Sequence, residues 1–307
     1  PASGPGGQAR LTQANAIQAG ILTFGTSETS MQAMQILSSA ADLLHQQLLV
    51  PQQFDCTGAG FVRLTVSDDD HNATLSNGDR VVTTYSACDG TDGTLQLAIT
   101  QVAFTSGVIS TLNGAVTINL RFTEFPAPTL TGSGQLEYRA TSSQLRWLGT
   151  NVAITLRANG QTEAMTGGRI EKTVTVPGFN YSVTISGTIN SDALGGRFTF
   201  ATSQPFGGID EVWPTIGVVT ATGASSSRIE FSAVAIPGLA EYRVDADGNG
   251  QYDAGVYVIS WTDIASGPLF GIYDDTPGPG DPPPDPTVEA LGRRVALGAA
   301  AGDLQVD

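Results

Sequence analysis

Two acidic segments carry the residue types that bind hard cations. The first, DDDHNATLSNGD from Asp68, places oxygen-bearing side chains at the alternating ligand positions of an EF-hand-type calcium loop. Ala73 stands where the turn favours glycine, and Asp79 is shorter than the usual glutamate at the last position. We expect a calcium site here, with an ion-free polar hairpin loop as the alternative. The expected ligands are Asp68, Asp70, Asn72, Thr74, Ser76 and Asp79.

The second segment, DADGNGQYD, follows the calcium-loop pattern more closely. Gly250 supplies the turn residue that the first loop lacks. Val256 occupies the last ligand position and has no side-chain oxygen, so water or another residue would complete the shell unless Asp253 coordinates directly. A plain Asp/Asn/Gly turn is the alternative. The expected calcium ligands are Asp245, Asp247, Asn249, Gln251 and Asp253.

Two cysteines flank a predicted hairpin. If FVRLTVS from Phe61 pairs with RVVTTYS so that Ser67 lies opposite Arg80, Cys56 and Cys88 meet near its open end. In an oxidising compartment they would form a disulfide, which stabilises the fold by about 3–4 kcal/mol in the chain-entropy model. Two separate buried thiols are the alternative. A zinc site has less support, because neither cysteine has a second Cys or a His at ligand spacing.

Enzyme motifs are scarce in the chain. It has 2 histidines and no nucleophile elbow, zinc-protease helix, phosphate-binding glycine loop or haem-attachment motif. Asp274 and Asp275 could serve as paired acid/base groups, but their Pro-Gly surroundings favour a solvated linker. We therefore expect a non-enzymatic protein.

The charge balance restricts the partners and the compartment. Among 307 residues, 29 Asp and Glu against 14 Lys and Arg give a net charge of −15, which argues against nucleic acids and anionic membranes. No apolar run is long enough for a membrane-spanning helix. The chain starts at Pro1 without an initiator methionine, as expected after removal of an export signal. We expect an extracellular or cell-surface protein.

The N-terminal region predicts helices. Residues 1–10 suggest an extended arm, and residues 11–50 a helical segment in which Thr12 caps a first helix that stops at Gly25. His45 flanks the apolar stripe of a second helix and is expected to be structural. The stripe should pack on a sheet, although a partner or lipid groove is an alternative. Its members are Met31, Met34, Leu37, Ala41, Leu44 and Leu48.

From Phe61 to Trp261 the apolar period changes to two, which predicts a mainly β domain over residues 51–267. Asn113-Gly114, Asn159-Gly160 and Pro177-Gly178 are the clearest turn signals. We expect a large antiparallel meander curled into a barrel or sandwich, with the amphipathic helices packed on it. The candidate strands are 61–67, 80–86, 94–105, 108–123, 135–140, 151–158, 169–176, 180–189, 196–202, 216–222, 228–235, 240–244 and 255–262.

Two long runs, FDCTGAGFVRLTVSDDDHNATLSNGDRVVTTYSACDGTDGTLQLAIT and VWPTIGVVTATGASSSRIEFSAVAIPGLAEYRVDADGNGQYDAGVYVISWTDI, resemble an uncharacterised family of exported proteobacterial β-rich proteins, many of them lipoproteins. The resemblance covers Leu11 to Trp261. It implies export, the Cys56–Cys88 bridge and the acidic loops, and it brings no established activity. The chain differs from the family in having no lipid-acceptor cysteine near Pro1 and in the segment after Trp261.

The C-terminal residues 268–307 predict a spacer and a docking tail. The spacer, DDTPGPGDPPPDPT over 274–287, should be extended and polyproline-like. The apolar residues after it are too few to form a core alone, so we expect them to mediate assembly with a neighbouring copy, with folding back on the same chain as the alternative. These assembly residues are Val288, Leu291, Val295, Leu297 and Leu304.

These observations favour a non-enzymatic structural subunit of an extracellular filament or surface layer. It would be stabilised by calcium and a disulfide, and it would join other copies head to tail, with possible attachment to the cell envelope. A periplasmic or outer-envelope carrier of a hydrophobic ligand is the first alternative. A monomeric adhesin-like module is the second.

Overall fold

The computed structural model describes residues 7–265, except for residues 48, 124–127, 210–212, 237 and 254. Asp274 and Asp275, the predicted spacer and the expected assembly residues from Val288 to Leu304 therefore lie outside the described residues, as does Leu48 of the helix stripe.

One antiparallel sheet of 14 strands makes up most of the fold, and each strand pairs with its neighbours in chain order. The predicted meander is confirmed. The predicted barrel or sandwich is wrong, because the single sheet is not closed and leaves β1 and β14 as its edges. A helix fills the concave side, so the sheet needs neither closure nor a second sheet to bury its apolar face.

The strands follow the alternating pattern of the sequence. Their bounds are β1 (Gln52–Asp55), β2 (Phe61–Ser67), β3 (Arg80–Cys88), β4 (Thr91–Thr105), β5 (Val108–Phe122), β6 (Thr129–Ala140), β7 (Gln144–Ala158), β8 (Gln161–Thr175), β9 (Asn180–Ser191), β10 (Gly196–Ile209), β11 (Ile216–Thr222), β12 (Arg228–Ala233), β13 (Leu239–Asp245) and β14 (Tyr257–Ser260). Short 3-10 helices, η1 (Gln13–Asn15) and η2 (Ala224–Ser226), and the helix α2 (Trp261–Ala265) complete the described elements.

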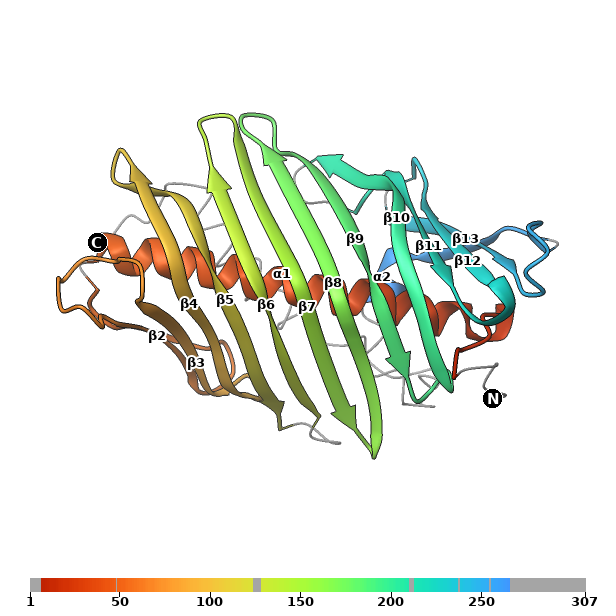
Figure 1. The fold of residues 1–307 in the computed structure, drawn as a ribbon, viewed down its shortest axis with the longest axis horizontal. Helices are drawn as coiled ribbons and strands as arrows, with labels where there is room; N and C mark the ends of the chain where they lie inside the picture. The colour runs from red at the N-terminus through yellow and green to blue at the C-terminus, as the bar shows by residue number, and fades with distance from the viewer. Residues whose placement is uncertain are drawn as a thin grey trace.

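The long helix α1 (Ala16–Gln46) replaces the two helices that the sequence predicts. Gly25 lies inside it rather than at its end. A glycine in a helix interior costs about 1 kcal/mol relative to alanine, and packing against the sheet offsets this cost. Figure 1 shows α1 running along the sheet and crossing most of its strands. The described members of the predicted stripe, Met31, Met34, Leu37, Ala41 and Leu44, are all buried.

Small and hydroxyl-bearing residues allow α1 to lie close to the strands. Thr26, Ser27 and Ser30 are buried, and each hydroxyl donates to the carbonyl four residues earlier in the helix. Gly149 of β7 faces Met34, which a Cβ at this position would strike. The helix therefore fills the curved sheet as a plug, which confirms its expected packing on the sheet.

Long-range pairing overrides one of the turn signals. Asn159-Gly160 joins β7 to β8 and Pro177-Gly178 joins β8 to β9, as predicted. Asn113-Gly114 instead lies within β5, in agreement with the candidate strand 108–123, and Gly114 pairs with Ile99 and Leu136. A Cβ at Gly114 would strike the backbone of β4, so this glycine serves close strand approach rather than a turn.

Residues 7–10, the described part of the predicted arm, dock on their own chain. The Ala9 N–H donates to the Arg197 carbonyl at 2.9 Å, and the Ala9 carbonyl accepts from the Ala224 N–H at 2.7 Å. Ala9 and Leu11 are fully buried. The N-terminal segment is thus held beside β10 before α1 begins.

Candidate metal-binding loops

The β2–β3 loop (residues 68–79) gathers three carboxylates. The hairpin pairs Ser67 with Arg80, which confirms the predicted register and brings the two ends of the loop together. Asp68, Asp70 and Asp79 each offer a carboxylate oxygen within 4.8 Å of the others. This acidic cluster could hold a metal ion.

Hydrogen bonds within the β2–β3 loop give it a defined turn. The Asp68 carboxylate accepts from the backbone N–H groups of Asn72 (3.2 Å) and Ala73 (2.9 Å). Asp70 accepts from the Asn72 N–H (3.2 Å) and from its side-chain amide (2.6 Å). The Asn72 Oδ1 in turn accepts from the Thr74 N–H (2.7 Å) and hydroxyl (2.6 Å). Asp68, Asp70 and Asn72, three of the expected ligands, therefore accept hydrogen bonds from residues of the same loop.

The second half of the loop is anchored in the protein body. Asp79 is 1% exposed and accepts from the N–H groups of Asp69 (3.2 Å) and Ser76 (2.7 Å). The Ser76 hydroxyl lies 3.0 Å from Asp70 and 3.2 Å from Asp79, so it links two members of the cluster. Leu75, the apolar residue between Thr74 and Ser76, belongs to the core. The cluster thus sits on a fixed part of the sheet.

Hydrogen bonds, rather than ion pairs within the described residues, stabilise the charges of the cluster. Partial desolvation raises the pKa of the Asp68 carboxyl, but hydrogen bonds, led by the one from the Ala73 N–H, outweigh it and hold this pKa below its usual value. Within residues 7–265 as described, no Lys or Arg forms an ion pair with Asp68, Asp70 or Asp79. Three carboxylates at this spacing repel one another, which favours a bound cation.

Ala73 adopts the backbone conformation that calcium loops assign to glycine. Its φ is 59°, in the left-handed region, where a Cβ costs about 1–2 kcal/mol. Alanine in place of glycine therefore raises the energy of the turn but does not change its shape.

The β13–β14 loop (residues 245–253) repeats the same hydrogen bonds at the same spacing. Asp245 accepts from the N–H groups of Asn249 (3.2 Å) and Gly250 (3.0 Å). Asp247 accepts from the Asn249 N–H (3.0 Å) and side-chain amide (2.9 Å). The Asn249 Oδ1 accepts from the Gln251 N–H at 2.7 Å. The two loops therefore share one turn, although they lie at opposite edges of the sheet (Figure 1).

An arginine distinguishes the β13–β14 loop from the β2–β3 loop. The Arg228 Nε lies 3.2 Å from Asp245 Oδ2, and its Nη2 donates to the Gly250 carbonyl at 2.6 Å. The guanidinium also lies 4.9 Å from the centre of the Tyr252 ring, whose hydroxyl donates to Glu230. The sequence-based prediction missed Arg228, because only the β12–β13 register places it opposite Asp245.

The remaining acidic groups of this loop are further apart. Asp253 accepts from the Ala246 N–H at 3.1 Å. Among the described residues, Asp245, Asp247 and Asp253 do not bring three carboxylates within 4.8 Å of one another. A cation here would depend on amide and carbonyl oxygens, such as those of Asn249 and Gln251, and would lie near the positive charge of Arg228.

The predicted disulfide between Cys56 and Cys88 is present, with the two Cα atoms 5.4 Å apart. It lies at the end of the β2–β3 hairpin opposite the acidic cluster, so the hairpin is held at both ends. Asp89, which the sequence did not single out, fixes the segment after β1 by accepting from the Gly58 N–H at 2.6 Å. The bridge sulfurs are bonded to each other and are not metal ligands in this state.

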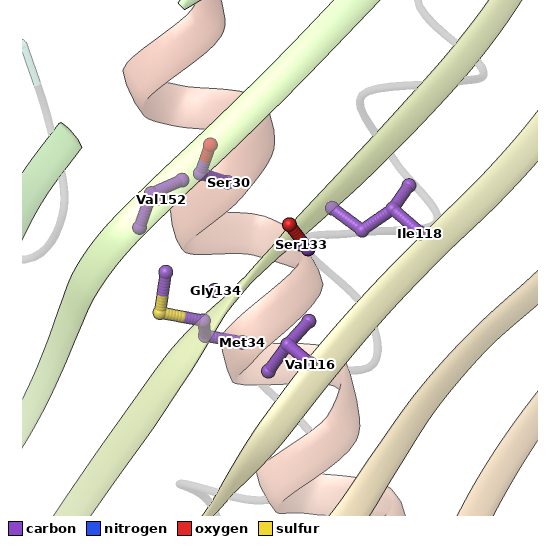
Figure 2. Close-up of a pocket in the computed structure, with 7 residues that line it drawn as sticks. All are labelled: Ser30, Met34, Val116, Ile118, Ser133, Gly134 and Val152. Atoms are coloured by element: carbon purple, nitrogen blue, oxygen red, sulfur yellow. The ribbon is translucent and has the colours of Figure 1, made fainter. Parts of the chain in front are cut away.

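In the described part of the chain, α1 packs closely on strands β5, β6 and β7. A cavity of about 10 Å³ lies between the helix and strands β5, β6 and β7, and Figure 2 shows Met34 and Ser30 at its helix side. This volume suits about one water molecule. At the far end of α1, His45 stacks on Phe104 with ring centres 4.0 Å apart, consistent with its expected structural role.

None of the described helices is both long enough and apolar enough to span a membrane. No family model matches the chain, and no curated protein or solved structure shows significant similarity to it.

Proposed function

We propose that the protein is a non-enzymatic structural subunit of an extracellular filament or cell-surface assembly, stabilised by calcium and by the Cys56–Cys88 disulfide. The observation that carries this proposal is the open sheet whose concave side is filled by α1. With the interior occupied, the outer surface, the loops and the sheet edges are left for function.

The filled interior also weighs against the first alternative, a carrier of a hydrophobic ligand. Binding sites for such ligands are usually apolar cavities of about 300–1,000 Å³. The cavity beneath α1 measures about 10 Å³, and Met34, Val116 and Ile118 occupy the adjacent space. A carrier would need α1 to move away from the sheet, which would expose its buried stripe.

Calcium is the proposed ion because the ligand atoms are hard oxygens. Carboxylate, amide and carbonyl oxygens on a loop suit calcium better than zinc, which prefers sulfur and nitrogen. The uncompensated charge of Asp68, Asp70 and Asp79 makes the β2–β3 loop the stronger proposed site. The β13–β14 loop is the weaker one, because Arg228 already neutralises part of its charge.

An exported location accords with the disulfide and with the family resemblance. Disulfides persist in oxidising compartments and are rare in the cytosol. The excess of acidic residues accords with a partner other than nucleic acid. We propose further that the C-terminal residues 268–307 join copies head to tail.

Native mass spectrometry combined with negative-stain microscopy tests the proposal. The full chain, with calcium and with a chelator, should form polymers whose mass rises with protein concentration. The variant that lacks residues 274–307 should remain a folded, calcium-responsive monomer. A full chain that is monomeric under all conditions would reject the structural-subunit proposal and favour the adhesin alternative, whereas a monomer that carries bound lipid would favour the carrier.

A further inference from the structure

Within the described part of the chain, each edge strand of the sheet pairs with one neighbouring strand only. β1 and β14 have 4 residues each, and they are the terminal strands of the sheet and do not pair with each other. Each therefore presents backbone N–H and C=O groups on one side without a strand partner in the described part of the chain. Such an edge is a template for pairing with another chain.

Strand direction permits the two edges to meet head to tail. Consecutive strands of the meander alternate in direction, so in a sheet of 14 strands the first and the last run in opposite directions. A second copy that continues the sheet would then place its β1 antiparallel to β14 of the first, with a rotation set by the twist of the sheet. This contact uses two different surfaces, so it leaves one open edge at each end and continues into a polymer.

The side chains and the hydrogen-bonding groups of the two edges also match. Phe54 of β1 pairs with Val62 and Ile259 of β14 pairs with Ala240, which places Phe54 and Ile259 on the concave side. The Cys56 N–H donates to the carbonyl of Gly60, which precedes β2, and the Trp261 N–H donates to the carbonyl of Gly238, which precedes β13. Because N–H groups alternate along a strand, residues 53 and 55 of β1 and 258 and 260 of β14 point outward.

These outward-pointing residues all lie on the convex side of the sheet. Opposed residues of an antiparallel pair must share a face, and here the free donors and acceptors of both edges belong to the same face. A β14–β1 pair can therefore form every main-chain hydrogen bond while Phe54 packs beside Tyr257 or Ile259. If the side-chain faces or the outward hydrogen-bonding groups of the two strands did not match, pairing would require a β-bulge.

Both edges expose apolar side chains, and their protection is limited to their short length and to Asp55 of β1. Phe54 is 48% exposed and Val258 is 61% exposed, and the flanking Val50 and Val256 are 56% and 48% exposed. Neither β1 nor β14 contains a lysine or a proline, the residues that commonly block edge pairing.

We propose that β14 of one copy pairs with β1 of the next and that this contact sets the direction of the assembly. The inference rests on the proposed function and names the surface through which it acts. A pair of 4-residue strands buries less than the roughly 1,000 Å² of a stable interface. The proposed function already assigns residues 268–307 to assembly, and we infer that they supply the remaining contact.

Proline substitutions test the pairing because they remove an outward donor and leave the partner strand within the chain untouched. Gln53→Pro blocks the β1 edge and Val258→Pro blocks the β14 edge, each in the full chain. Gln53→Val and Val258→Thr retain the donors and serve as matched controls. Analytical ultracentrifugation, with thermal unfolding to confirm the fold, measures the result.

Each proline variant should sediment as a monomer, whereas both controls should polymerise like the parent protein. An equal mixture of the two variants should form dimers and stop there, because the Gln53→Pro copy retains β14 and the Val258→Pro copy retains β1. Polymers of either proline variant alone would overturn the edge contact and leave the structural-subunit proposal standing. Failure of the parent protein to polymerise would instead reject the proposed function itself.

Discussion

The β2–β3 and β13–β14 loops share one turn but differ in charge. In both, the first aspartate accepts from the same two backbone amides, and the following Asp and Asn form the same contacts. Around the first loop three carboxylates stand together without a basic partner in the described structure. In the second, Arg228 pairs with Asp245. Local sequence thus determines the turn, and the neighbouring strand determines the charge that a cation would meet.

The two loops therefore rank differently by their match to the calcium motif and by the negative charge that a cation would meet. The β13–β14 loop has the better sequence, because Gly250 stands at the turn. The β2–β3 loop has the stronger field, because Asp79 completes a cluster that Val256 cannot complete at the equivalent position. A motif describes the donors that one segment contributes, while affinity also depends on every charge nearby.

The largest expected effect comes from removing the disulfide, which is present in only one of the two hairpins that carry the loops. Only the β2–β3 hairpin is closed by the disulfide, whose cysteines are separated by 32 positions in the sequence. Replacing both residues, Cys56→Ser with Cys88→Ser, should lower the free energy of unfolding by about 3–4 kcal/mol, because the unfolded chain gains freedom. Urea unfolding measures the loss.

Hydrogen exchange on the same double variant separates this global effect from a local one. Amides that exchange only through complete unfolding should exchange faster throughout the sheet, because the loss acts on the unfolded chain, and amides of the β2–β3 hairpin should lose additional protection. A loss of stability below about 1 kcal/mol would contradict the role assigned to the bridge.

Calcium should distinguish the loops directly. At a calcium concentration one hundred times the Kd, binding to the native state should raise the free energy of unfolding by about 2.7 kcal/mol. Asp70→Asn should abolish most of this gain, because it neutralises a member of the uncompensated cluster. Asp247→Asn, its matched control in the other loop, should retain most of it. Thermal unfolding with calcium and with chelator measures both variants.

Arg228→Gln sharpens the calcium test. In the Asp70→Asn background, removal of the guanidinium should restore a calcium response at the β13–β14 loop, worth on the order of 1 kcal/mol, because a positive charge near the site is lost. If Asp247→Asn proves the more damaging of the two single changes, the ranking of the loops by charge is wrong.

The smallest expected effect comes from exchanging the two turn residues. Ala73 has φ 59° and Gly250 has φ 91°, so both lie in the left-handed region. Ala73→Gly should stabilise the protein by about 1 kcal/mol, and Gly250→Ala should destabilise it by a similar amount, since no atom crowds the position and only backbone strain changes. Denaturant unfolding in chelator isolates this effect from metal binding. A change of the same sign in both variants would contradict the shared turn.

The sequence predicted most of the strands because their signal is local, but it predicted four of them only in part, namely β6 as 135–140, β7 as 151–158, β8 as 169–176 and β10 as 196–202. β2 and β11 were predicted with their observed bounds, and the Ser67–Arg80 pairing followed from alternation alone. The errors arose where contacts between distant segments outweigh local preference. Gly25, a predicted helix end, lies inside a helix that packs against the sheet. Asn113-Gly114, a predicted turn, lies in β5 and pairs with β4 and β6. β1, with 4 residues, was too short to predict.

By itself, the sequence determined the alternating strands, the buried stripe of α1, the shape of both acidic turns and the pairing of Cys56 with Cys88. Each depends on periodicity or on spacing between residues close in the chain. Only the tertiary structure decided that the sheet stays open around one helix, that Arg228 faces Asp245, and that β1 and β14 are the terminal strands of the sheet. These properties depend on which strands become neighbours and in what register, and no short segment of the chain contains that information.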